Sequence, residues 1–197
     1  MRLIAAALLL LSMARSQDAA RYARQFQADF TSSVEAAEWL EQNAPRFTCP
    51  DAEVERAWYY RWWSYRQHIE QTPQGYVITE FLRPVKHAGP YNTISCALGH
   101  HIAEGRWLRD ARYVDDDVAY WLKTYPPHFH QYSGWAAWAV YQRWLADGRT
   151  AEATGLLDAL LKEYAQWVSE RQTPGGLFWQ CDVRDGMEES ASGSRRN

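Results

Sequence analysis

The sequence that decides the fold is QYSGWAAWAVYQRWLADGR at residues 131–149, followed by LLDALLKEYAQWVSERQTPGGLFW at residues 156–179. In both stretches apolar side chains recur every three or four residues, which is the spacing of one face of an α-helix. Asp-Gly separates the two stretches, and TPGG ends the second. The pattern predicts helices over 132–146 and 151–171, the second with a buried apolar side made of Leu157, Leu160, Leu161, Tyr164 and Val168.

The segments before this hairpin are also predicted to be mostly helical. Residues 18–44 form an amphipathic segment, and Asp51 is placed to cap a helix of about twenty residues that ends before Pro73. That helix carries one apolar stripe at three- and four-residue steps, which consists of Val54, Trp58, Trp62, Tyr65 and Ile69.

A short break and two more helices follow. GYVITEFL at residues 75–82 alternates and is rich in β-branched residues, which predicts a short strand or an extended loop. Helices are expected over 93–107 and 114–124, before the turn YPPHFH. The fold class is therefore predicted to be all-α, with roughly five or six helices in consecutive hairpins and little strand.

The composition excludes several classes of protein. The chain has 197 residues, of which 47% are hydrophobic, and that length suits one ordinary domain or part of a larger one. A net charge of -3 leaves no basic stripe to neutralise phosphates, so nucleic acid is not expected as a partner. Aromatic residues make up 15% of the chain, which excludes intrinsic disorder. The mean hydropathy of -0.54 and the absence of a long internal apolar run predict no membrane-spanning helix.

Residues 1–16 have the layout of a secretory signal peptide. Arg2 precedes an apolar run over 3–11, and small residues follow at Ser12 and Ala14. The expected mature protein is secreted or periplasmic, has no membrane association after cleavage, and begins with an N-terminal helical segment at 17–50. The alternative is an apolar N-terminal helix of a cytosolic protein.

Cysteine and histidine spacings give no support for a metal site. Cys49, Cys96 and Cys181 have no CxxC spacing, and we expect them to be buried as small apolar residues without a specific disulfide. GHHIAEG places His100 and Glu104 on one helical face, but HHxxE is not HExxH and no further ligand has a recognised spacing. Neither a metal nor a cofactor is expected.

Aromatic and polar residues occur together at helix ends and in loops. WYYRWW, PYNTIS, PPHFHQYSGW and LFWQCDVRDGME are the four clusters, within a chain that has 11 tryptophans and 12 tyrosines. Flat rings beside hydrogen-bonding groups suit a sugar, because C–H faces stack on the rings while hydroxyls need polar partners. The alternative is that the tryptophans are core residues. The candidate substrate-binding residues are Trp62, Asn92, His100, Gln131, Trp179 and Asp185.

Three motifs resemble glycoside hydrolases with an (α/α)6 barrel. QYSGWAAWAVYQRWLADGR resembles the start of one barrel helix, LLDALLKEYAQWVSERQTPGGLFW resembles the next hairpin, and DGMEESASG at 185–193 resembles the loop of type S-G-M-D-N-S. Their order and spacing resemble glycoside hydrolase family 63 and the related mannosylglycerate hydrolase-like domains. The resemblance implies that residues 51–197 are a partial six-hairpin toroid, the N-terminal half of a larger enzyme.

The resemblance also implies a mechanism. The acid after Gly-Met is the family's general acid, which points to Glu188, although this chain has Glu in place of Asp there and Glu189 in place of the usual Asn. Asp185 and Glu189 are rivals for the role. Inverting glycosidases need a second carboxylate to activate water. The family takes that general base from a later hairpin, so this chain is expected to be a truncated fragment that is inactive alone.

Three function classes remain open at this stage. The first is an exported hydrolase that inverts an α-linked glycoside and therefore has a carbohydrate substrate. The second is a non-catalytic carbohydrate-binding or scaffold module, which does not need Glu188. The third is a toroid of the polysaccharide lyase type, which needs a Tyr or His base instead. No residue discriminates among sugars or linkages.

The signal peptide leads to a direct prediction. We expect residues 1 to about 16 to be absent from secreted material, because the leader has the basic, apolar and small order that signal peptidase recognises. Intact-mass measurement of exported protein checks this, and material that retains Met1 to Ser16 contradicts it.

Overall fold

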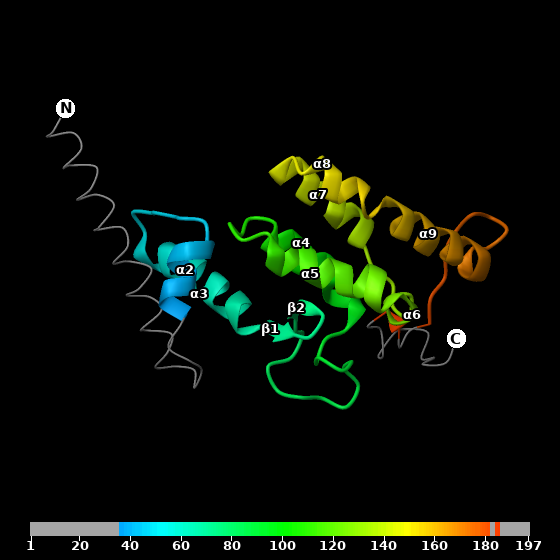
Figure 1. The fold of residues 1–197 in the computed structure, drawn as a ribbon, viewed down its shortest axis with the longest axis horizontal. Coiled ribbons are helices and arrows are strands. Elements are labelled where there is room, and N and C mark those ends of the chain that lie inside the picture. The colour runs from blue at the N-terminus through cyan, green and yellow to red at the C-terminus, as the bar shows by residue number, and fades with distance from the viewer. Residues whose placement is uncertain (1–35, 182–183, 186–197) are drawn as a thin grey trace, which may run out of the picture. The chain divides into compact units, whose positions relative to one another are not determined.

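A computed structural model describes residues 36–181 and 184–185 of the chain. The chain divides into two compact units, which are treated separately below. Unit 1 comprises residues 1–69 and 107–110, and unit 2 comprises residues 70–106 and 111–197. The elements of both units are labelled in Figure 1.

The described part of unit 1 is built on two helices, α2 (Ala36–Asn43) and α3 (Ala52–Gln67). Asp51 caps α3, because its carboxylate accepts the amides of Glu53 and Val54 at 2.9 and 3.4 Å. Arg109 meets the other helix: its guanidinium donates to the carbonyls of Glu41 and Gln42 at the C-terminus of α2. The described core of the unit is strongly aromatic and includes Trp39, Leu40, Tyr59, Trp62 and Trp63.

Unit 2 contains a short hairpin followed by helices. The hairpin is β1 (Ile69–Thr72, whose first residue belongs to unit 1) and β2 (Gly75–Ile78). The helices are η1 (Ser95–Ala97), α4 (Leu98–Gly105), α5 (Arg112–Ala119), the π-helical turn η2 (Tyr120–Thr124), α6 (Pro126–Phe129), α7 (Ala136–Asp147), α8 (Thr150–Thr154) and α9 (Leu157–Arg171). Their apolar faces meet in one core that includes Val77, Leu98, Ile102, Val114, Val118, Trp121 and Ala139.

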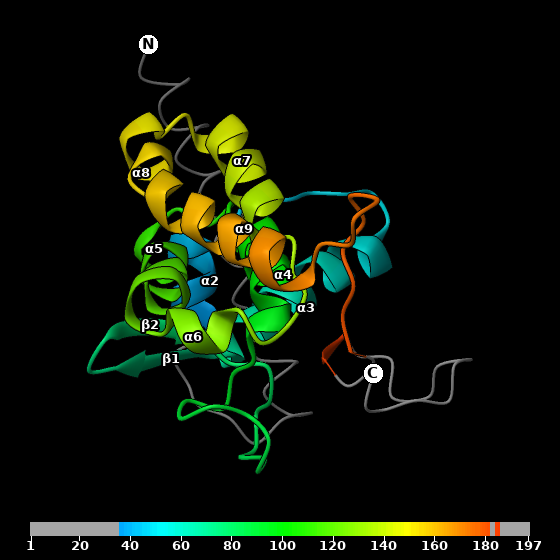
Figure 2. The same ribbon diagram turned by 90° about the vertical axis from the view of Figure 1, so that its right-hand side faces the viewer.

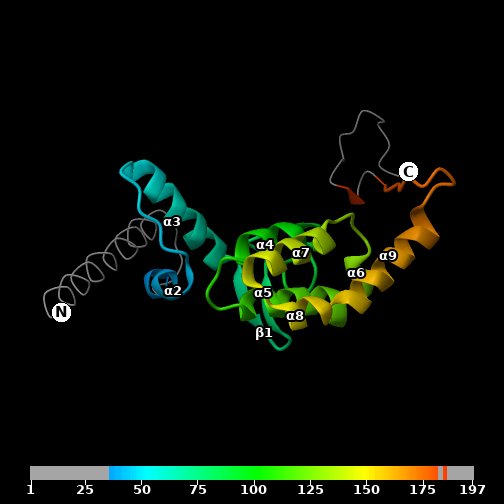
Figure 3. The ribbon, with the colours of Figure 1, turned by 90° about the horizontal axis from the view of Figure 1, so that it is seen from above.

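Helices α4 and α7 lie side by side, as Figure 3 shows. Gly99 makes this possible, because a Cβ atom at this position would lie 2.7 Å from ring carbons of Trp135. The indole ring thus occupies the space that any larger residue would fill. The His100 ring meets the same indole edge to face, with centroids 4.8 Å apart.

Two consecutive aspartates attach α5 to the hairpin, which lies below α5 in Figure 2. Asp116 Oδ2 accepts the amide of Tyr76, and Asp117 Oδ1 accepts the amide of Ile78, both at 3.0 Å. Asp117 is fully buried, and its Oδ2 lies 3.3 Å from Nδ1 of His101 on α4. The carboxylates therefore satisfy strand amides that a third strand would otherwise have to pair.

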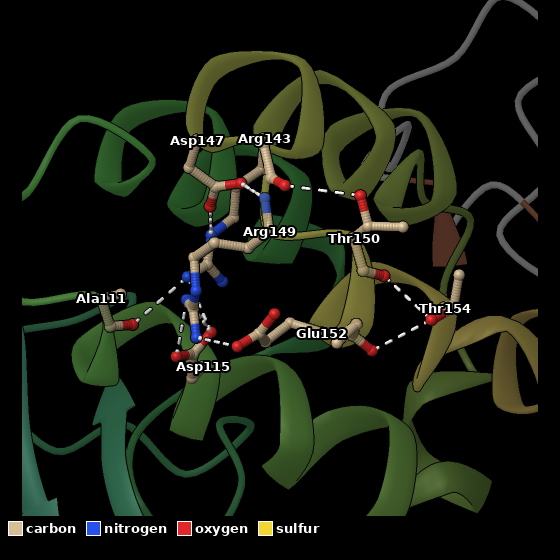
Figure 4. Close-up of polar contacts among 10 residues, drawn as sticks. Ala111, Asp115, Arg143, Asp147, Arg149, Thr150, Glu152 and Thr154 are labelled. Carbon is tan, nitrogen blue, oxygen red and sulfur yellow. Dashed lines mark hydrogen bonds and ion pairs between the residues drawn. The ribbon is translucent and has the colours of Figure 1, made fainter.

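A network of ion pairs joins α5 to the turn between α7 and α8 (Figure 4). Arg143 contacts Asp115 at 2.7 Å and Asp147 at 3.3 Å, and Arg149 contacts Asp115 at 2.9 Å and Glu152 at 3.0 Å. Hydrogen bonds and charge from Asp115 and Glu152 outweigh burial and raise the pKa of Arg149. Asp115 thus pairs with both guanidinium groups, and with Asp147 and Glu152 it balances their charge and ties α5 to the turn.

Most elements expected from the sequence are confirmed. The described part of the chain is predominantly helical, Asp51 caps its helix, and residues 75–78 form a strand. Ile69 was expected on the stripe of the preceding helix, but α3 ends at Gln67 and Ile69 begins β1. The expected helix at 151–171 is likewise interrupted and becomes α8 and α9, with Gly155 and Leu156 between them.

The predicted buried side of the last helix is wrong. Leu161 and Tyr164 are 55% and 58% exposed, and Leu157 and Val168 are also exposed, while only Leu160 packs against the core. Helix α9 is apolar on two faces, and it turns the face with Leu156, Ala159 and Leu160 inward. A helical period identifies a face but cannot choose between two such faces.

Two further sequence expectations bear on the described residues. No helix among them combines the length and apolarity needed to cross a membrane. Cys49, Cys96 and Cys181 are free thiols, and each is half-buried rather than fully buried as expected.

Asp117→Ala is expected to lower the free energy of unfolding by about 2–4 kcal/mol, because it leaves the Ile78 amide buried without an acceptor and removes the charge beside His101. Asp158→Ala, at an exposed position of α9, is the control and should change stability by less than about 0.5 kcal/mol. Urea unfolding followed by circular dichroism measures both. Equal stability of the two variants would show that the buried carboxylate does not hold the hairpin.

Candidate functional site

A cavity of about 430 Å³ lies in unit 2, where three loops meet. We call it the first pocket. Its walls come from residues 87–95, from residues 121–132 and from Arg184. The lining is mixed aromatic and polar: Trp121, Tyr125 and Tyr132 supply rings, and His87, Ser95, His128, Gln131 and Arg184 supply hydrogen-bonding groups.

Asn92 orders the loop that forms one wall. Its backbone has a positive φ of 56°, a left-handed conformation that Asn tolerates better than most residues. The side-chain amide donates to the carbonyls of Phe81 and Arg83, and the side-chain oxygen accepts the amide of Val85 at 3.0 Å. The side chain of Asn92, a predicted binding residue, therefore makes its hydrogen bonds within the loop. Its binding role stays a prediction.

A π-helical turn and a serine build the wall opposite. Ser95 Oγ lies 3.3 and 3.1 Å from the carbonyls of His128 and Phe129, which ties η1 to α6. In η2 the Tyr125 amide donates to the Tyr120 carbonyl at 2.8 Å, a five-residue step of the kind that is frequent at functional sites. Trp121 follows on this turn, and its buried indole N–H has no acceptor among the described residues.

The third wall joins two of the sequence motifs. Arg184 Nη1 donates to Gln131 Oε1 at 3.3 Å, and its guanidinium lies over the ring of Tyr132, 5.2 Å from the centroid. The Ser133 hydroxyl donates to Asp185, and the Ser133 amide donates to the Arg184 carbonyl at 3.4 Å. Residues 131–133 and 184–185 are thereby held together although about fifty residues separate them.

These contacts bring two of the predicted site residues together. Gln131 lines the first pocket, and Asp185 lies beside it through Ser133. His100 and Trp179 do not line it: His100 packs on Trp135, and Trp179 lies under the guanidinium of Arg171 at 5.7 Å.

The two remaining predicted residues are Trp62 and Glu188. Trp62 belongs to unit 1, where it is 1% exposed and packs edge-on against Trp58 and Tyr65. Glu188 lies outside the described residues. The roles of both stay predictions.

Electrostatics beside the first pocket are governed by burial. Desolvation raises the pKa of Glu80, and the charges of His101 and His87 partly oppose this increase. His87 also lines the pocket. Burial, with the negative charge of Glu80, raises the pKa of the Cys96 thiol to about 11. The two groups lie 3.9 Å apart, so neutral forms are favoured at this position.

The histidines do not gather into a metal centre in the part of the chain that the structure describes, where no group of three His, Cys, Asp or Glu ligands is found. His101, one of the pair in GHHIAEG, is instead beside Asp117 in the core.

None of the described residues that line the first pocket is Asp or Glu. The described lining thus combines aromatic rings with uncharged and basic hydrogen-bonding groups, a combination that suits a polyhydroxyl ligand.

The sequence predicted only part of this pocket. Tyr132 and Arg184 stand next to predicted residues in the same motifs, HQYSGW and QCDVRDG, so an aromatic or a cation flanking a predicted polar residue was the available signal. Ser95 ends the cluster PYNTIS, so its signal was also available. Trp121 lies in none of the four clusters and reaches the pocket through the π-helical turn.

Comparisons with known proteins agree with this architecture. The model of the mannosylglycerate hydrolase MGH1-like glycoside hydrolase domain matches residues 90–196, more than half of the chain. This match assigns the helical hairpins of the described chain to the six-hairpin type of carbohydrate-active hydrolase domain. The chain belongs to the MGH1-like glycoside hydrolase domain family.

A solved structure supports the same fold. A chain titled "Sialidase" superposes with a TM-score of 0.85 at 39% identity, over 92% of this chain. The match covers 18% of that chain, so this sequence spans less than a fifth of the length of its structural relative. No curated protein sequence matches the chain.

Proposed function

We propose that the first pocket binds a sugar ring of an α-linked glycoside and that this chain supplies the general acid, Glu188, of an inverting glycoside hydrolase. The observation that carries the proposal is the double attachment of residues 184–185 to residues 131–133. Glu188 follows Asp185 by three residues, a length that spans at most about 11 Å. The attachment therefore keeps the acid-bearing loop within reach of the pocket.

The chemistry suits the pocket. Pyranose C–H faces pack on aromatic rings, which the partly exposed Tyr125 and Tyr132 supply, while Gln131 and Arg184 supply polar groups for hydroxyls. A general acid must be protonated when it meets the leaving oxygen, and aromatic surroundings favour the neutral carboxyl.

The general base is the second requirement. The family resemblance assigns it to a later hairpin of the barrel. The proposal also includes export through the leader at residues 1–16, which accords with an extracellular glycoside as substrate.

One observation favours a second candidate, a module that binds carbohydrate without cleaving it. The described lining of the first pocket contains no carboxylate, and binding needs none. Loss of sugar binding on removal of Gln131 fits both candidates, whereas a catalytic defect on removal of Glu188 fits only the hydrolase.

Binding is predicted to depend on Gln131. Gln131→Ala should weaken binding of methyl α-mannoside or methyl α-glucoside by about two- to tenfold, because one or two hydrogen bonds and the support of Arg184 are lost. Gln166→Ala, at a position that does not line the first pocket, is the control and should bind as the parent does. Isothermal titration calorimetry measures both, and no binding of either glycoside by the parent chain contradicts the proposal.

Catalysis is predicted to depend on Glu188. In a longer relative that carries the same loop, the substitution equivalent to Glu188→Gln should lower kcat/KM on alkyl glycosides by about 10²–10⁴-fold. Aryl glycosides should lose much less, because a good leaving group needs little protonation. The equivalent of Glu189→Gln is the control and should keep kcat/KM on both substrate types. Equal losses on both substrate types for the Glu188 variant remove Glu188 from the acid role.

A further inference from the structure

A second cavity of about 320 Å³ adjoins the first pocket, and Tyr132 lines both. We call it the second pocket. It lies in unit 2 between the segment 129–137 and helix α9, with Phe178 at its edge. Five of its eleven described lining residues are aromatic, and Glu163 is the one acidic residue among them.

Glu163 is held in a fixed orientation. Its Oε1 lies 2.8 Å from His130 Nδ1 and accepts the indole N–H of Trp167 at 2.7 Å. The other ring nitrogen of His130 lies 3.1 Å from Glu170 Oε2, so the buried imidazole is clamped between two carboxylates. Hydrogen bonds from Gln166 and His130 lower the pKa of Glu170, which favours the ionised form of that carboxyl group.

The second oxygen of Glu163 remains available. The Glu163 side chain is 15% exposed, and Oε2 has no hydrogen-bond donor among the described residues. Because Oε1 already has two neighbours, Oε2 is the acceptor that this carboxylate offers to a ligand in the pocket. A carboxylate oxygen accepts hydrogen bonds from hydroxyl groups and repels anions.

The rings around Glu163 form a surface for stacking. Tyr164 and Trp167 project from α9, and the Phe178 ring lies 6.1 Å from Tyr164 and 6.4 Å from Trp167. Tyr164 and Phe178 are 58% and 43% exposed, so their faces are open to a ligand. An aromatic wall with one oriented acceptor is what a neutral pyranose ring needs.

We propose that the second pocket binds a further neutral pyranose of the same ligand, so that the substrate is a chain of at least two sugar rings that passes Tyr132. This rests on the proposed function, since it takes the first pocket as the place of one ring. The Tyr132 phenol stands at the wall between the two rings, and Glu163 Oε2 accepts a hydroxyl of the second.

The test compares ligands with one, two and three rings. The probes are methyl α-mannoside, α-1,2-mannobiose and α-1,2-mannotriose, with methyl α-glucoside, maltose and maltotriose as the glucose series. Calorimetry measures their affinity for the parent chain and for Tyr164→Ala, Glu163→Gln and Leu161→Ala. Leu161 is the matched control, because it is as exposed as Tyr164 on the same helix but does not line the second pocket.

In one of the two series, two-ring ligands should bind the parent about tenfold tighter than the methyl glycoside. Tyr164→Ala should remove about three- to tenfold of that affinity and leave the one-ring affinity unchanged, as expected for the loss of one stacked ring. Glu163→Gln should show the same dependence on ring number, and Leu161→Ala should match the parent. Because Tyr164 is exposed, its truncation keeps the test independent of any folding defect in Glu163→Gln.

Three results would overturn the inference. Equal affinity for one and two rings, or a Tyr164→Ala defect that is the same for both, excludes a ring in the second pocket. If methyl glycosides bind through Gln131 and the second ring adds nothing, this inference fails while the proposed function stands. If none of the six sugars binds, both fail together.

Discussion

The buried carboxylate of Asp117 is the constraint on which the rest of unit 2 depends. It has no exposed surface, accepts the Ile78 amide and lies beside His101, so it links α5 to both the hairpin and α4. Ile78 in turn accepts the hydroxyl of Thr93, which fixes the end of the loop that walls the first pocket. A carboxylate that is buried away from water is stable only beside polar partners. The contacts of Asp117 therefore determine where α5, α4 and the hairpin lie.

The elements that the sequence predicted well are those with a local cause. Asp51 caps α3 because its carboxylate reaches amides two and three residues later. Residues 75–78 form a strand, which the β-branched Val77 and Ile78 favour, although both of these side chains are buried and do not alternate. The failures have non-local causes. Ile69 pairs with the next strand in a hairpin and does not continue the helix. The face of α9 that points inward depends on its contacts with the rest of the core, which the helical period of α9 alone does not specify.

The same division applies to the site. Gln131 and Asp185 could be predicted because each lies in a motif where aromatic and polar residues alternate. Glu163 could not, since on a helix it resembles any solvated acid, and only the fold places His130 and Trp167 against it. Trp62 was predicted as a binding residue although it lies in the core. The sequence cannot distinguish a tryptophan that stacks on a sugar from one that packs in an aromatic core, and only its burial in the structure does so.

The attachment of residues 184–185 to residues 131–133 also has a consequence for the order of folding. Contacts within helices and hairpins close short loops, whereas Arg184–Gln131 and Ser133–Asp185 close loops of 53 and 52 residues. Closing these long loops costs chain entropy, and the contacts that offset this cost form only after α7 and α9 have folded. The first pocket is therefore assembled late, and in the native state its third wall opens at less cost than the helices beneath it.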